Sequence, residues 1–463
     1  MIKVLLLTSL LFVTAWWGQA QRILDFDSFS IEDGFSSSKP NVFLQDREGF
    51  IWVGTWNGLT RFDGYECVVY KSGIGNEPRT ISNREVTALL EDERGNIWIG
   101  TSYGLNRLNP RTDEIDQYPF ESRIMTLFED AEGMLWVGTW SDGLFRVDPE
   151  TGEAESFLTG SVINDVVEDL NGELWVATYN GLVNLNRATK AFVRFIPNPE
   201  EPERSINNNT LTQLALGANG ELWIGSWGGG VSRMRPQLDK DSLRFEHFVV
   251  REGPGSLRSN DVYRLHYDFL GNLWIGTWDE GLALLDSTEQ MKLPDQAVFH
   301  TFVSDLSDPY SISGNNISAL MVDRSGILWV GSAEIDRTSV LQSGIKRYST
   351  ARDGDPGLSL QSPVRSFAGD DAGNLWVGTA NELLHYQKME EGYRLMNRIP
   401  KQRYRTGNQW FQSNSVLALE VTPDGLLVGT DDAGLLFYSK EDLERGDFSS
   451  FVGFNSLTNS ALP

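Results

Sequence analysis

A ten-residue unit recurs along the chain, and this repetition constrains the fold more than any other feature. The unit reads Asp-x-x-Gly-x-Ile/Leu-Trp-Ile/Val-Gly-Thr, as in 92–101. Further copies occupy 46–55, 130–139, 169–178, 268–277, 323–332 and 370–379, a copy without the leading Asp occupies 217–226, and a degenerate one with Leu427 for the Trp spans 424–430. Self-similarity with this spacing is the signature of a repeat architecture in which each unit forms one supersecondary module.

Each unit and its flanks predict four short strands. Asp followed three positions later by Gly suits a tight turn, because the carboxylate accepts a backbone N–H and Gly tolerates positive φ. The Trp-containing run that follows is typical of a buried strand. An apolar strand precedes the turn, a Gly-Leu strand follows the unit, and an aromatic-tipped strand ends the repeat. Each Trp of the units at 52, 98, 136, 175, 223, 274, 329 and 376 is expected to face the core.

The repeat spacing identifies the architecture as an all-β propeller. Trp98 and Trp136 are 38 residues apart, and Trp274 and Trp329 are 55 apart. Propeller blades of four strands repeat at about 40–50 residues, whereas helical solenoids of similar period would need apolar residues at helical spacing, which this chain lacks.

The repeats predict a domain organisation. We expect a seven-bladed β-propeller over 21–355, followed over 356–463 by the first blades of a second, incomplete propeller. The alternative is that all nine repeats close into one large ring. We favour the interpretation that the sequence is a fragment of a longer protein. The segment 26–30 resembles the outer strand of a blade that has no beginning, and we expect it to close the ring by pairing with a distant blade, whose identity stays open.

Residues 1–20 have the pattern of a secretory signal peptide. Lys3 precedes an apolar stretch from Val4 to Trp17, and small residues at 18 and 20 favour cleavage after Ala20. The stretch is shorter than the ~20 residues needed to span a bilayer. A periplasmic or secreted location is therefore expected.

Charge limits the partners. The formal charge of −25 and the pI near 4.6 argue against nucleic acid and anionic membranes. They also disfavour a polyanionic ligand, unless a local basic patch overrides the average. The sequence shows no nucleotide loop or zinc spacing, so no cofactor is expected, and each Asp-x-x-Gly turn offers one carboxylate where Ca²⁺ takes six to eight oxygens, so no metal is expected either.

The pattern Asp-x-x-Gly-x-Ile/Leu-Trp-Ile/Val-Gly-Thr-x-x-Gly-Leu, as in 92–105, resembles the two-component regulator propeller repeat. In that family, tandem propellers form the periplasmic sensor of hybrid histidine kinases, many of which respond to oligosaccharides. The resemblance implies kinase and response-regulator domains in a full-length relative, and these domains lie outside this sequence. It implies a ligand-sensing rather than an enzymatic role.

A series of aromatic residues marks a candidate ligand surface. In each of the first six repeats, a Trp or Tyr follows the Thr or Ser that ends the unit within two residues, and several have acids or amides beside them: Trp56, Asn57, Tyr103, Trp140, Asp142, Tyr179, Asn180, Trp227, Trp278, Asp279 and Glu280. Sugar C–H faces stack on aromatic rings, while carboxylates and amides hydrogen-bond sugar hydroxyls. The alternative is that these aromatics only pack over the neighbouring blade as a second layer.

Two further functions stay open. His266 occupies an inner-strand position that is apolar in sister repeats, and next to Tyr263 and Arg264 it would suit the general base of a propeller lyase acting on a glycan or cyclic peptide. A hydrogen-bonded core histidine is the competing interpretation. A protein-binding scaffold is the third candidate, and a homodimer is compatible with the sequence.

Overall fold

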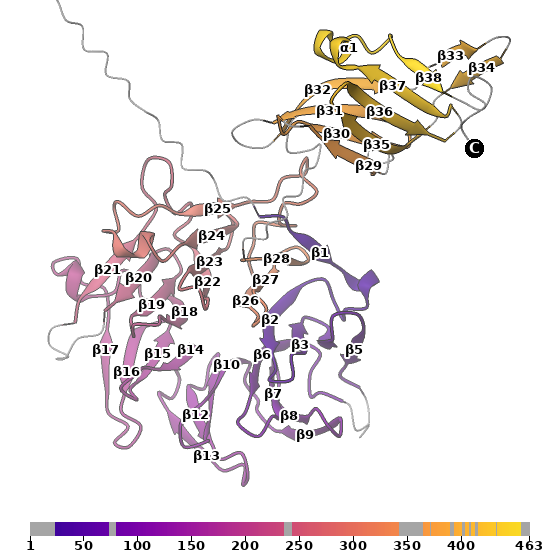
Figure 1. Cartoon of the computed structure of the whole chain (residues 1–463). Helices are drawn as coiled ribbons and strands as arrows, with labels where there is room; N and C mark the ends of the chain where they lie inside the picture. The colour runs from indigo at the N-terminus through magenta and orange to yellow at the C-terminus, as the bar shows by residue number, and fades with distance from the viewer. Residues whose placement is uncertain are drawn as a thin grey trace, which may run out of the picture. The chain divides into compact units, whose positions relative to one another are not determined.

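The computed structural model describes residues 24–73, 80–235, 243–341, 364–370, 372–388, 393–400, 403–406, 409–412, 415–431 and 433–454. These residues form nine four-stranded antiparallel sheets and one two-stranded hairpin (Figure 1). Close contacts divide the chain into two units, Met1–Gly344 and Ile345–Pro463. The predicted signal peptide and the boundary expected at 355/356 both lie outside the described residues. Of the described helices, none is long and apolar enough to cross a membrane.

The first unit consists of seven blades with the predicted order of strands. The first strands are β2 (Pro40–Gln45), β6 (Val86–Glu91), β10 (Ile124–Glu129), β14 (Ile163–Glu168), β18 (Leu211–Leu216), β22 (Val262–Tyr267) and β26 (Ala319–Val322). The second strands, which carry the Trp, are β3 (Ile51–Thr55), β7 (Ile97–Thr101), β11 (Leu135–Thr139), β15 (Leu174–Thr178), β19 (Leu222–Ser226), β23 (Leu273–Thr277) and β27 (Ile327–Gly331). The third strands are β4 (Gly58–Phe62), β8 (Leu105–Asn109), β12 (Leu144–Val147), β16 (Gly181–Leu185), β20 (Gly230–Met234), β24 (Leu282–Leu285) and β28 (Ile335–Ser339). The outer strands are β5 (Cys67–Tyr70), β9 (Glu114–Tyr118), β13 (Ala154–Phe157), β17 (Phe192–Phe195), β21 (Phe245–Phe248), β25 (His300–Phe302) and β1 (Asp27–Phe29), and short 3-10 helices span Ile31–Asp33, Pro202–Arg204 and Glu289–Met291.

The seven blades close into a ring. Each first strand packs against the first strand of the next blade, and β26 of the seventh blade packs against β2 of the first. The N-terminal strand β1 pairs with β28 as the outer strand of the seventh blade, with Asp27 opposite Arg337 and Phe29 opposite Ile335. The predicted closing strand is thus present, and the structure identifies its partner as blade seven.

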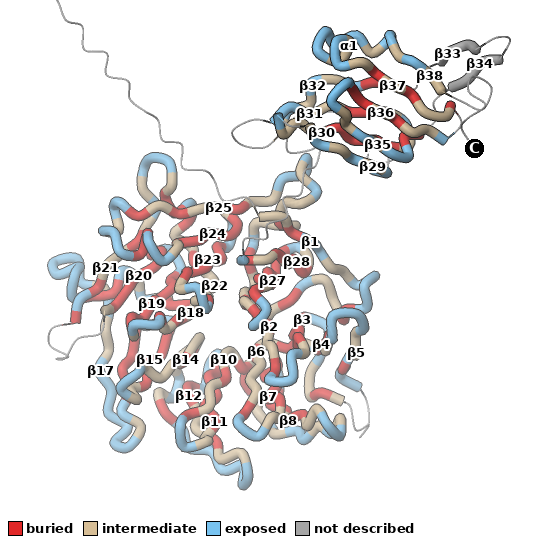
Figure 2. Tube along the Cα trace, in the orientation of Figure 1, coloured by how far each residue is buried: buried red, intermediate tan, exposed pale blue. Residues whose placement is uncertain are grey.

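The Trp residues form the core between blades, as predicted. All eight are at most 4 % exposed. In six blades of the ring the indole N–H donates to the carboxylate of the leading Asp, as in Trp52 to Asp46 at 2.8 Å and Trp274 to Asp268 at 2.8 Å. The Asp therefore caps the turn and also satisfies the buried indole. Figure 2 shows these buried positions running along the inner strands of the blades, with the loops exposed.

The Gly of the repeat lets adjacent blades approach closely. A Cβ on Gly54 would lie 2.6 Å from Val86 Cγ1 on the next blade and 2.7 Å from Val42 Cγ1. Distances this short are unfavourable contacts, so only Gly or a rearranged neighbour fits there.

Blade five lacks the leading Asp, and the structure shows the consequence. Gly217 stands at that position, and the Glu221 side chain occupies the space in which a Cβ on Gly217 would lie. The Trp223 indole N–H has no hydrogen-bond partner among the described residues. The Arg233 guanidinium packs 5.0 Å from the Trp223 ring, as arginines do on the corresponding Trp of blades one, two, three and seven.

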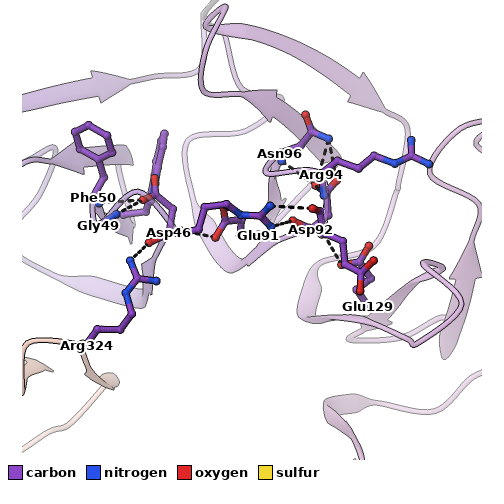
Figure 3. Close-up of polar contacts among 12 residues, drawn as sticks. Asp46, Gly49, Phe50, Glu91, Asp92, Arg94, Asn96, Glu129 and Arg324 are labelled. Carbon is purple, nitrogen blue, oxygen red and sulfur yellow. Dashed lines mark hydrogen bonds and ion pairs between the residues drawn. The ribbon is translucent and has the colours of Figure 1, made fainter.

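Polar side chains link consecutive blades on the face that carries the Asp-x-x-Gly turns, here called the turn face. Arg324 of blade seven donates to Asp46 O at 2.5 Å, and the Arg47 backbone donates to Glu91 at 2.8 Å (Figure 3). The Glu93 backbone donates to Glu129 at 2.9 Å. These contacts join blade seven to blade one and continue to blade three.

The second unit contains two packed blades and a hairpin. Its strands are β29 (Val364–Gly369), β30 (Leu375–Thr379), β31 (Glu382–Lys388), β32 (Tyr393–Pro400), β33 (Arg403–Thr406), β34 (Gln409–Gln412), β35 (Val416–Thr422), β36 (Gly425–Thr430), β37 (Leu435–Ser439) and β38 (Val452–Phe454), and its helix is α1 (Lys440–Arg445). The first strands β29 and β35 pack against each other, and Trp376 lies in the core between the sheets.

Candidate functional site

The candidate site is built on the loops that follow the second strands of blades one to six, on what is here called the loop face of the ring. The last residue of the repeat organises each loop. The Thr55 hydroxyl donates to Gly58 O at 2.9 Å and accepts from the Asn57 backbone at 3.0 Å. The same donation recurs from Thr101, Thr139, Thr178, Ser226 and Thr277 to the carbonyl of a following Gly. Because the capping contact is shared, the six loops begin and end alike, with two or three residues between the capping Thr or Ser and the Gly.

Those loops expose the six predicted aromatic side chains, here called the aromatic rim: Trp56, Tyr103, Trp140, Tyr179, Trp227 and Trp278. Their exposed fractions lie between 38 and 54 %. The Trp140 and Tyr179 rings meet at 5.3 Å, and the Trp227 and Trp278 rings meet at 5.3 Å. The structure therefore joins neighbouring members in pairs while leaving ring surface open to solvent. Trp56 and Tyr103 make no aromatic ring contact among the described residues.

Polar side chains accompany the aromatic rim. Asn57, Asp142, Asn180 and Asp279 are exposed, and Glu280 is partly buried. The Asp142 carboxylate accepts from the Ser141 hydroxyl at 2.9 Å, and the Asn57 side chain contacts Ser36 O at 3.4 Å. Their remaining hydrogen-bonding capacity faces solvent beside the rings.

Sequence reasoning left Tyr263 out of the site. At the second position of the first strand, sister blades carry small polar residues that bind the next blade: Asn41 donates to Val86 O, Thr87 to Ile124 O, Asn164 to Leu211 O, Thr212 to Val262 O and Ser318 to Pro40 O. Blade three carries Met125 at this position, and in blade six the position is Tyr263, whose ring lies 5.6 Å from the Trp278 ring. The signal in the sequence was an aromatic residue at a position that is small and polar in five of the six sister blades, which is the kind of local departure expected at functional sites.

Tyr263 extends the aromatic rim toward the axis of the ring. Burial raises the pKa of the Tyr179 hydroxyl, and Tyr263 adds a smaller contribution in the same direction. The Arg264 guanidinium stacks 4.1 Å from the Tyr263 ring. A continuous series of ring contacts thus runs from Trp227 through Trp278 and Tyr263 to Arg264.

A central cavity of about 430 Å³ lies beyond Arg264, between the first strands. Its lining comes from blades one, five, six and seven, and includes Asn41, Gln45, Gln213, Arg264, His266 and Arg324. Cavities of this size are typical of small-molecule sites. Because β22 runs from the loop face to the turn face, Arg264 lies near the mouth beside Tyr263, and His266 lies deeper.

His266 is a hydrogen-bonded structural histidine. Its Nε2 accepts from the Val322 backbone N–H of blade seven at 3.0 Å. Burial lowers the pKa of His266 from 6.5 to about 4, and the charge of Asp268 opposes this shift only in part. The imidazole is therefore neutral at pH 7 with its Nε2 lone pair engaged, which favours the core interpretation over the general base.

We expect His266 to make folding sensitive to mild acid. The unfolded histidine binds a proton as pH falls through 6.5, while the folded one stays neutral until about pH 4, so its contribution to stability is lost over that window. Between pH 7 and pH 5 the advantage of the wild type over His266→Gln should fall by about 2 kcal/mol. Chemical denaturation of both proteins at the two pH values measures this difference. An advantage independent of pH would show that His266 titrates alike in both states.

The described residues contain no cluster of three or more His, Cys, Asp or Glu side chains suited to a metal ion.

Comparison with known proteins identifies the repeats. The repeat described as two component regulator propeller matches residues 34–57, 80–103, 118–141, 256–279, 311–334 and 357–381. This chain contains two-component regulator propeller repeats. Four of the matched propeller repeats end inside the loops that carry Trp56, Tyr103, Trp140 and Trp278. Comparison with curated proteins gives no significant match.

Solved structures confirm the propeller fold. The extracellular domain assigned to the hybrid two component system BT3049 from B. thetaiotaomicron is 20% identical, with a TM-score of 0.61 over 90% of this chain and 54% of that chain. The corresponding domain of BT4673 from the same organism is 20% identical, with a TM-score of 0.56 over 94% of this chain and 54% of that one. The two-component regulator propeller chain thus spans about half the length of these neighbours.

A catalytic propeller also shares the fold. Virginiamycin B lyase from Staphylococcus aureus, crystallised with quinupristin, is 13% identical, with a TM-score of 0.52 over 69% of this chain and 100% of that chain. At this identity the likeness concerns the fold alone.

Proposed function

We propose that this chain is the exported ligand-sensing region of a hybrid two-component sensor and that it recognises an oligosaccharide on the aromatic rim. Kinase and response-regulator domains of a longer protein would receive the signal. The observation that carries the proposal is the exposure of a Trp or Tyr within two residues of the same loop start in six consecutive blades. The repeat family and the extracellular hybrid-system neighbours support the sensor role.

The chemistry of the aromatic rim suits a sugar. Exposed Trp and Tyr faces offer stacking surface to sugar C–H groups, and the carboxylates and amides beside them offer hydrogen bonds to hydroxyl groups. A ligand spanning several loops would contact several blades at once. Its binding would therefore favour one arrangement of those blades, which is the requirement for passing a signal.

The test is a binding measurement on the rim. Oligosaccharides released from plant and animal polysaccharides are screened on an array, and the affinity of any ligand found is measured by calorimetry. Because each stacking contact contributes about 0.5–1.5 kcal/mol, Trp278→Ala should weaken binding by about 2- to 10-fold, and a combined change with Trp227→Ala should weaken it further.

Tyr65 offers a matched control. It is 94 % exposed and lies in the loop between β4 and β5, which emerges on the turn face. Tyr65→Ala should leave binding unchanged. Equal losses from Tyr65→Ala and Trp278→Ala, or no binding to any glycan, would contradict the proposal, and turnover of a bound glycan would favour the lyase instead.

We also propose that the second unit is the beginning of a second propeller. In the first unit the middle residue of each first strand packs on the Trp of the preceding blade, as Leu127 does on Trp98 and Leu265 on Trp223. The corresponding residue of β29 is Phe367, which is 74 % exposed, whereas Leu127 is 9 % exposed and Leu265 is 3 % exposed. An exposed Phe side chain at this position is expected where the preceding blade is absent, as in an incomplete propeller.

A further inference from the structure

Arg264 is chemically distinct from the residues at its level of the ring. The third position of the first strand is occupied, from blade one to blade seven, by Val42, Ala88, Thr126, Asp165, Gln213, Arg264 and Ala319, each paired with the Gly or Ala of its second strand. Arg264 is the single cation of this set. It therefore places one positive charge at the mouth of the central cavity.

The Arg264 guanidinium has N–H groups without a hydrogen-bond partner among the described residues. Its Nη1 donates to Tyr263 O at 3.1 Å, and it has no other hydrogen-bond partner among the described residues. Stacking on Tyr263 at 4.1 Å holds the guanidinium plane in place. A guanidinium held in this way presents a planar fork of N–H groups that matches a carboxylate or sulfate group.

The Asp165 carboxylate does not form an ion pair with the Arg264 guanidinium. The Arg264 charge lowers the pKa of the Asp165 carboxyl, but burial outweighs it and raises that pKa to about 6. Asp165 already accepts from the Leu214 backbone at 2.9 Å, the Thr126 hydroxyl at 3.0 Å and its neighbour Val166 at 2.9 Å. No ion pair joins Asp165 and Arg264 in the described part of the chain.

The cavity is locally basic although the chain is acidic. Its lining includes Arg264 and Arg324 and contains no Asp or Glu. Charges more than about 8 Å apart in solution are largely screened at physiological ionic strength, so the overall charge of −25 does not determine what this cavity binds.

We propose that Arg264 binds a carboxylate or sulfate group of the ligand, so that the site takes an acidic oligosaccharide whose charged sugar enters the cavity mouth. This inference rests on the proposed glycan function and specifies its ligand class. The neutral part of the ligand stacks along Trp227, Trp278 and Tyr263, and the charged sugar meets Arg264 at the end of that series. Because a neutral ligand cannot form this charge-assisted hydrogen bond, acidic ligands should bind about tenfold or more tightly than neutral ones.

The experiment compares matched ligands. An array presents uronate-bearing and sulfate-bearing oligosaccharides, each beside its carboxyl-reduced or desulfated counterpart, and calorimetry with inorganic sulfate and monomeric galacturonate distinguishes a free anion from an acidic sugar. The wild type should bind acidic members about tenfold or more tightly than their neutral counterparts. Arg264→Gln should abolish this preference and Arg264→Lys should keep part of it, because Lys retains the charge but not the planar fork.

Arg94→Gln is the control, since Arg94 is an exposed arginine in the Asp-x-x-Gly turn of blade two, on the turn face, and does not line the cavity. It should retain the preference, with thermal unfolding confirming that each variant is folded. Three results would overturn the inference while leaving the glycan proposal standing. They are equal binding of acidic and neutral partners by the wild type, a preference that survives in Arg264→Gln, and binding of inorganic sulfate as tight as that of the acidic glycans. Failure to bind any glycan would overturn both.

Discussion

Trp274→Ala is expected to lower the free energy of unfolding of the seven-bladed unit by about 3–5 kcal/mol, the usual cost of removing a buried Trp side chain. Trp274 is fully buried and packs with Phe26, Leu282 and Phe302 between blades six and seven. Its loss leaves a cavity and also removes the indole donor from the buried Asp268 carboxylate. Urea denaturation followed by tryptophan fluorescence measures the change.

Trp278 provides the matched control, because it is the same residue type four positions along the same blade. It is 44 % exposed and lies on the aromatic rim. Trp278→Ala should change stability by no more than about 0.5 kcal/mol, in line with other surface substitutions, while weakening glycan binding. Equal destabilisation by the two substitutions would contradict the division of these Trp residues into core and rim.

Removal of residues 24–30 is the second change with a large expected effect. It deletes β1 and leaves β28 as an unpaired edge of blade seven. It also removes the buried Phe26, and Phe29, which packs between Trp329 and the Arg337 guanidinium. Since truncating one buried Phe costs about 3–5 kcal/mol, the loss should be on the order of 5 kcal/mol or more.

The measurement is thermal unfolding together with gel filtration, because an open edge strand promotes association between chains. A chain beginning at Leu24 is the control and should match the full chain, since it keeps every described contact of β1. A peptide covering 24–33, added in excess to the truncated chain, should restore part of the lost stability. An unchanged unfolding temperature after deletion of 24–30 would show that β1 does not hold the ring closed.

The strand order of each blade and the burial of the repeat Trp residues were predictable because both depend on local chemistry. Asp46 and Gly49 specify a turn, and Trp52 follows in a strand whose register brings its indole back to Asp46. The placement of the aromatic rim on these loops was predictable for the same reason, since each rim residue stands one or two positions after the Thr or Ser that caps its loop.

The parts of the site that depend on neighbouring blades were not predictable in this way. His266 is held by the Val322 backbone of the next blade. The small polar residues that stand where blade six has Tyr263 also act between blades, so the sequence shows their pattern but only the structure shows that they bind the next blade.

By itself, the sequence determined that this protein is built of propeller blades and where the aromatic residues stand in their loops, because turn chemistry, alternation and burial are set within about 40 residues. Only the tertiary structure decided that seven blades close one ring, that β1 completes the seventh, and that Arg264 stands alone at the cavity mouth. The physical reason is that strands of nearly identical pattern pair equally well in isolation. Their partners are selected by ring closure, which joins residues such as Ser28 and Asp336 that lie 308 positions apart.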